Sequence, residues 1–79
     1  MIKMFTYNRR YYIEGSMGAF AGQYTKQIID GQVIILNIYE IDWTRNSDRI
    51  HYMDNATAHA VLEKLERDYG YSDLSIEER

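Results

Sequence analysis

The sequence predicts an α+β fold in which an antiparallel four-stranded β-meander is followed by one C-terminal helix (ββββα). Two observations lead to this expectation. Asp30-Gly31 separates two runs of β-branched residues, and the apolar residues between Ala58 and Tyr69 recur at helical spacing. A chain of 79 residues has room for one small hydrophobic core, so both features belong to a single domain.

The Asp30-Gly31 pair predicts a tight hairpin and sets its register. A two-residue hairpin turn needs positive φ at both positions, which Asp and Gly tolerate. Counting outward from the turn gives three cross-strand pairs: Ile28 with Val33, Lys26 with Ile35, and Tyr24 with Asn37.

Further extended segments surround this hairpin. Alternating and β-branched residues predict strands over 2–7 and 10–14, 19–29, 32–43 and 49–53. Asn8-Arg9 bends the first segment, Gly15–Gly18 forms a turn, and Gly22 weakens the second strand. The polar residues 44–48 then form a loop that brings Asp42 opposite His51.

The helix follows the last expected strand. Its apolar stripe consists of Ala58, Val61, Leu62, Leu65 and Tyr69. Asp54 or Asn55 provides the N-cap, and Gly70 provides the C-terminal stop. We therefore expect one α+β domain over 1–71 and a polar C-terminal tail over 72–79, with a turn that begins at Ser75.

The central strand is apolar on both faces. Simple alternation places Val33, Ile35, Tyr39, Ile41 and Trp43 on one face and Ile34, Leu36 and Ile38 on the other. One helix covers only one of these faces. We expect Ile34, Leu36 and Ile38 to form a homodimer contact or a second interface, unless the N-terminal strand folds over them.

Composition limits the class of protein. The formal net charge is −3, and residues 31–79 carry five Lys or Arg against ten Asp or Glu. This acidity disfavours nucleic-acid binding over the whole surface. The chain has no Cys and shows neither a signal peptide nor a membrane segment, so we expect a protein of the cytoplasm. Its eight Tyr residues are typical of interaction surfaces.

We expect no catalytic residues, no metal site and no cofactor. His51 beside Asp42 resembles a general base, but no nucleophile accompanies them. His59 and Glu63 share a helix face, yet two ligands do not make a metal site. The glycine-rich segment 15–22 lacks a Gly-Lys-Ser/Thr ending, so it does not predict a phosphate-binding loop.

Two clusters predict partner binding. The first is basic and aromatic and contains Tyr7, Arg9, Arg10, Tyr11 and Tyr12. Arg and Tyr are favoured at the centres of protein interfaces, and they also bind single-stranded nucleic acid by ion pairing and stacking. The second is acidic and contains Glu40, Asp42 and Asp48. These carboxylates either mimic phosphates toward a basic groove or form a solvated strand end.

In general character the chain resembles small phage-encoded inhibitors of bacterial defence, the anti-CRISPR type. The resemblance covers the whole chain and rests on its compactness, acidity, lack of Cys, Tyr content and lack of a catalytic set. No motif carries it, so no functional residue is transferred. It implies a non-catalytic inhibitor, acting in the host cytoplasm, that binds a defence nuclease or a guide-RNA surveillance complex. The alternative from the residues alone is a single-stranded nucleic-acid-binding ββββα module.

Overall fold

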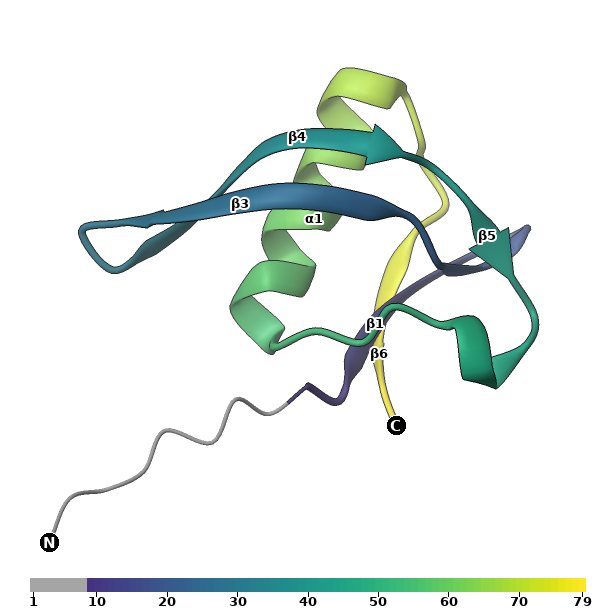
Figure 1. The fold of residues 1–79 in the computed structure, drawn as a ribbon. Helices are drawn as coiled ribbons and strands as arrows, with labels where there is room; N and C mark the ends of the chain where they lie inside the picture. Colours follow the sequence, from purple (N-terminus) through teal and green to yellow (C-terminus); the bar gives the residue numbers. More distant parts are fainter. Residues whose placement is uncertain (1–8) are drawn as a thin grey trace, which may run out of the picture.

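The computed structural model describes residues 9–79 (Figure 1). The described elements are β1 (Tyr11–Gly15), β2 (Gly18–Phe20), β3 (Gln23–Ile29), β4 (Gln32–Glu40), β5 (Trp43–Thr44), the short 3-10 helix η1 (Ser47–Arg49), α1 (Asn55–Tyr69) and β6 (Ser75–Glu78). The expected strand over 2–7 and the candidate Tyr7 lie outside these residues.

The fold class is confirmed, whereas the single four-stranded meander is wrong. The described strands form two sheets, both antiparallel. One has the order β5-β2-β1-β6, and the other is a two-stranded ribbon of β3 and β4. The ribbon crosses in front of α1 in Figure 1, and its hairpin end extends past the helix.

The two longest expected strands each break where the chain passes from one sheet to the other. The segment 19–29 divides at Ala21-Gly22, and the segment 32–43 divides at Ile41-Asp42. The two breaks lie side by side, because Ala21 N donates to Asp42 O over 2.8 Å. A Cβ added at Gly22 would lie 2.1 Å from Glu40 O, so this crossing requires glycine.

The hairpin register is confirmed near the turn and wrong farther away. Ile28 pairs with Val33 and Lys26 with Ile35, and both Asp30 and Gly31 have positive φ. Tyr24, however, pairs with Ile38 and not with Asn37. Thr25 and Lys26 are consecutive on β3 but pair with Asn37 and Ile35, so Leu36 is the extra residue of a β-bulge.

This bulge reverses the facing of β4 at Asn37 and Ile38, before a second register shift between the pairs Tyr24–Ile38 and Gln23–Glu40. Ile38 is only 4% exposed and belongs to the core, whereas Ile34 is 38% exposed and Leu36 is 53% exposed. The expected set of Ile34, Leu36 and Ile38 is therefore corrected: Ile38 leaves it, and Tyr39, expected on the covered face, is exposed.

The expected fourth strand over 49–53 and its hairpin are also wrong. Asn46 caps η1 by accepting a hydrogen bond from Asp48 N over 2.9 Å, so the chain turns there as a short helix. Asp42 does not face His51. Its carboxylate pairs with Arg49 over 2.6 Å, and His51 N donates to Phe20 O over 3.0 Å.

Ser75–Glu78, within the expected polar tail over 72–79, forms a strand. Ser75–Glu78 pairs antiparallel with β1, and Ile76 lies opposite the buried Ile13. The turn expected from Ser75 to Glu78 is therefore replaced by β6, which joins the two ends of the described chain in one sheet (Figure 1).

The helix agrees with its sequence pattern. Residues Ala58, Val61 and Leu65 are fully buried against the sheets, and Gly70 ends α1 with φ +79. Tyr69 Oη donates to Ile38 O over 3.1 Å, which ties the last turn of α1 to β4. Within residues 9–79, no helix is long and apolar enough to cross a membrane.

Candidate binding site

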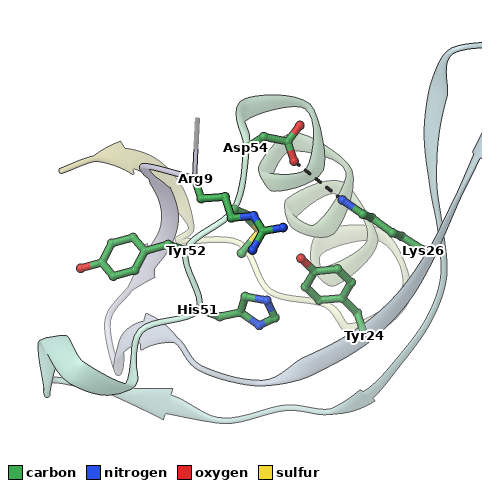
Figure 2. A pocket seen from close by; sticks show the side chains of 7 residues that line it. Arg9, Tyr24, Lys26, His51, Tyr52 and Asp54 are labelled. Atoms are coloured by element: carbon green, nitrogen blue, oxygen red, sulfur yellow. Dashed lines mark ion pairs between the residues drawn. The ribbon is translucent and has the colours of Figure 1, made fainter. Parts of the chain in front are cut away.

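A polar pocket of about 210 Å³ lies between β3 and the segment that leads into α1 (Figure 2). Its lining combines two cations, one carboxylate, one imidazole and two phenol rings. The residues are Arg9, Tyr24, Lys26, His51, Tyr52, Met53 and Asp54. They come from three separate parts of the chain that the fold brings together.

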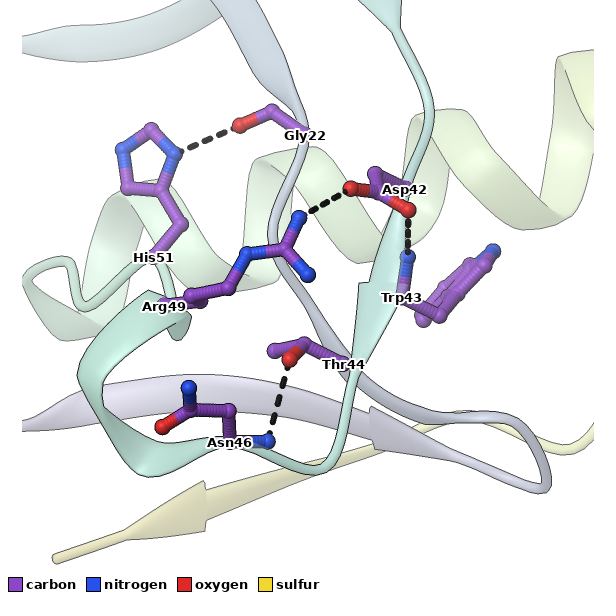
Figure 3. A network of polar contacts seen from close by, with 7 residues as sticks. All are labelled: Gly22, Asp42, Trp43, Thr44, Asn46, Arg49 and His51. Atoms are coloured by element: carbon purple, nitrogen blue, oxygen red, sulfur yellow. Dashed lines mark hydrogen bonds and ion pairs between the residues drawn. The ribbon is translucent and has the colours of Figure 1, made fainter.

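The His51 ring is held firmly in this pocket. Its Nδ1 lies 2.8 Å from Gly22 O (Figure 3). Because a carbonyl only accepts, Nδ1 carries the proton and Nε2 is the nitrogen left for a ligand. The ring stacks on Tyr24 with centroids 4.8 Å apart and on Phe20 with centroids 6.2 Å apart.

Lys26 and Asp54 form the charged end of the pocket. Lys26 Nζ donates to Thr57 Oγ1 over 3.0 Å and lies 3.8 Å from Asp54 Oδ1 (Figure 2). Thr57 in turn donates to Asp54. Burial raises the pKa of Tyr24, and the Asp54 carboxylate adds to this, while Arg9 opposes it.

Arg9 is the cation that this network leaves available. It is exposed and lines the pocket, and no ion pair of its guanidinium is found among the described residues. Lys26 is thus paired with Asp54 inside the pocket, whereas the charge of Arg9 is available to a ligand.

Tyr52 extends the pocket onto the neighbouring surface. Its ring packs edge-on against Tyr12 at 5.6 Å, and the Arg79 guanidinium lies 4.4 Å from its centroid. We call Arg9, Tyr12, Tyr24, Tyr52 and Arg79 the Tyr–Arg surface. Desolvation, followed by the nearby Glu14 and Glu77 carboxylates, raises the pKa of Tyr12.

The structure divides the basic-aromatic cluster predicted from the sequence. Arg9 and Tyr12 belong to the Tyr–Arg surface, whereas Tyr11 packs against the core because adjacent strand residues face opposite sides. Arg10 pairs with Glu78 on β6 over 2.6 Å. Sequence reasoning missed Tyr24, Lys26 and Tyr52 as site residues, since only the bulged ribbon and the long-range packing bring them to Arg9.

The three predicted acidic residues form no common site. Asp42 is engaged by Arg49 and also accepts from Trp43 N over 2.9 Å (Figure 3). Asp48 lies exposed in η1, and Glu40 ends β4. In the part of the chain that the structure describes, no three His, Asp or Glu side chains are placed to hold a metal ion.

The pocket has the chemistry of an anion receptor. A guanidinium and an ammonium favour a carboxylate or a phosphate, and the Tyr24–His51 stack offers a ring face beside it. The Thr57 hydroxyl is already bonded to Lys26 and Asp54.

No protein-family model, no curated protein and no solved structure matches this chain.

Proposed function

We propose that this chain is a small non-catalytic inhibitor that binds a host protein or ribonucleoprotein complex through the Tyr–Arg surface. In line with the general resemblance, the target class is a bacterial defence nuclease or guide-RNA surveillance complex, and the source is a phage. The observation that carries the binding role is the continuity of Arg9, Tyr24, Tyr52, Tyr12 and Arg79.

The composition of this surface favours protein binding. Tyr and Arg dominate the energetic centres of protein interfaces because they combine large contact area with polar groups. The edge-on packing of Tyr12 on Tyr52 and the position of Arg79 over Tyr52 order these side chains before a partner arrives. Preordered side chains lose less entropy on binding.

The pocket also indicates which partner group it accepts. Arg9 is exposed and lines the pocket, while Lys26 is only 3.8 Å from its own counter-ion Asp54. A partner carboxylate placed here would therefore pair first with Arg9. We expect an acidic side chain of the partner to enter the pocket beside the Tyr24–His51 stack.

Affinity capture from host lysate, with and without nuclease treatment, tests the proposal. Capture that survives nuclease supports a protein partner. Arg9→Ala and Tyr52→Ala should each weaken the complex by about 2 kcal/mol, roughly thirtyfold, as interface centres do. Arg45→Ala, at an exposed position that lines neither the pocket nor the face of α1 beside β4, is the matched control and should leave affinity unchanged. Equal loss in all three variants contradicts the assignment of this surface.

A second candidate function is single-stranded nucleic-acid binding. The stacked Tyr24 and His51 rings lie beside Arg9 and Lys26, which is the combination of ring face and cation that such binding uses. Fluorescence anisotropy with labelled single-stranded DNA and RNA distinguishes the two candidates. Submicromolar binding that weakens steeply with salt, and that Arg9→Ala reduces, favours this second candidate.

A further inference from the structure

The β3–β4 ribbon has two edges, which differ in the charged residues that they carry. Among residues 9–79, no third strand pairs with either edge. The β3 edge carries Lys26, whose charge points toward Thr57 and Asp54, and an inward-pointing charge is a common device against edge pairing. β4 contains no Lys, Arg or Pro between Gln32 and Glu40. The part of its edge between Gln32 and Ile35, which lies on the turn side of the bulge at Leu36, therefore lacks the usual protection.

The hairpin turn determines which backbone groups β4 presents at its free edge. In a two-residue hairpin, the residues that flank the turn exchange both backbone hydrogen bonds, and pairs then alternate outward. Ile29–Gln32 and Gln27–Ile34 are thus the bonded pairs, and Ile28–Val33 and Lys26–Ile35 are the open ones. Val33 and Ile35 direct their N–H and C=O groups away from β3.

A groove runs between this edge and α1. Its two contiguous parts, of about 460 and 170 Å³, share Val33, Ile34, Ala60 and Glu63. Small side chains, Ala56 and Ala60, leave space along the helix, while Glu63, Lys64 and Arg67 continue the same helical stripe. The groove thus combines free backbone groups with a helix face.

We propose that a second copy of the chain occupies this groove by pairing its own β4 edge antiparallel with the first. A two-fold axis at Ile34 lets Val33 of each copy exchange both backbone hydrogen bonds with Ile35 of the other, and gives a four-stranded sheet, β3-β4-β4-β3. Ile34 of one copy then lies opposite Ile34 of the other on the outer face of this sheet. The pairing covers part of the exposed apolar face.

The charges beside the edge favour a copy over an unrelated strand. α1 crosses the ribbon from β3, where Thr57 accepts a hydrogen bond from Lys26, to β4, where Ala60 and Glu63 line the groove beside Ile34 (Figure 1). An axis at Ile34 therefore brings residues of the two helices near each other. Ile34 lies beside Glu63 and Lys64, so the axis brings Glu63 toward the cations of the other copy.

This inference does not depend on the proposed inhibitor function, because the Tyr–Arg surface includes β3 and lies away from the β4 edge. It also differs from stacking of the outer sheet faces. Gln27 and Ile34 are paired on the same outer face, but only Ile34 lies on the β4 edge. Ile34→Lys and Gln27→Lys are therefore matched variants that separate edge pairing from face stacking.

Sedimentation equilibrium at ~100 μM, well above a micromolar dissociation constant, gives the first result. We expect twice the 9.4 kDa chain mass. Val33→Pro removes one outward N–H and no β3–β4 bond, so it and Ile34→Lys should each raise the dimer dissociation constant at least about tenfold. Gln27→Lys should not. Far-UV circular dichroism identifies any variant that unfolds.

An isotope-filtered NOE in a mixed labelled and unlabelled sample provides a test without substitutions. Edge pairing predicts amide contacts between Val33 of one copy and Ile35 of the other. A monomer at ~100 μM overturns the proposal. It is equally overturned if Gln27→Lys and Ile34→Lys weaken the dimer alike, or if the dimer lacks the Val33–Ile35 contact.

Discussion

Ile38→Ala tests the bulge in β4 most directly, with Leu36→Ala as its partner. Simple alternation places both residues on one exposed face, whereas the structure buries Ile38 and leaves Leu36 half exposed. Truncating a buried Ile costs about 2–5 kcal/mol because it removes apolar contact and leaves a cavity. Truncating a half-exposed Leu should cost less than about 1 kcal/mol.

These energies translate into separable transitions. With a urea dependence of about 1 kcal/mol per molar, Ile38→Ala should lower the midpoint by about 3 M, and Leu36→Ala by less than about 1 M. In thermal unfolding, a loss of about 3 kcal/mol corresponds to roughly 12–24 °C for a domain of this size. The wild type and both variants should be compared at two protein concentrations, because self-association adds to apparent stability. Equal midpoints for the two variants would refute the bulged register.

Three further predictions concern single interactions. Gly22→Ala should cost about 2 kcal/mol or more in denaturant unfolding, because its Cβ meets Glu40 O, while Gly31→Ala, with φ +78 and open space, should cost only about 1–2 kcal/mol. Hydrogen bonds from Ser16 hold the pKa of Asp73 below its usual value. The contribution of this carboxylate to the free energy of unfolding is therefore present above about pH 4 and lost as the pH falls. Asp73→Asn should make the free energy of unfolding depend less on pH in acid. Asp42→Asn removes the exposed pair with Arg49 and should cost less than about 1 kcal/mol, so a larger loss would show that the pair is more than a surface contact.

Local sequence signals predicted the local parts of the fold. Asp30-Gly31 fixes its own turn, and the apolar stripe with Gly70 fixes α1, because both depend on residues close along the chain. The bulge at Leu36 carries no such signal. It arises because Ile38 is buried in the core while Tyr24 packs against the core and stacks on His51, which is a demand of packing across distant segments.

The same distinction explains β6 and the candidate site. Ser75–Glu78 has one apolar residue, Ile76, so its local pattern resembles a polar tail until β1 is beside it. Arg9 and Tyr12 were recognised from their types. Their neighbours Tyr24 and Lys26 on β3 and Tyr52 before α1 were not, because these two segments are distant from Arg9 along the chain and the expected strand over 49–53 placed His51 opposite Asp42.

The arrangement of β1 between β2 and β6 has a consequence for folding kinetics. The β3–β4 hairpin and α1 consist of contacts between near neighbours, which form quickly. The four-stranded sheet instead joins the beginning and the end of the described chain, and closing so long a loop slows the rate-limiting step. Weakening the Ile13–Ile76 pair should therefore test whether this loop has already closed in the folding transition state. If it has, the weakened variant folds more slowly. If it has not, the variant unfolds faster.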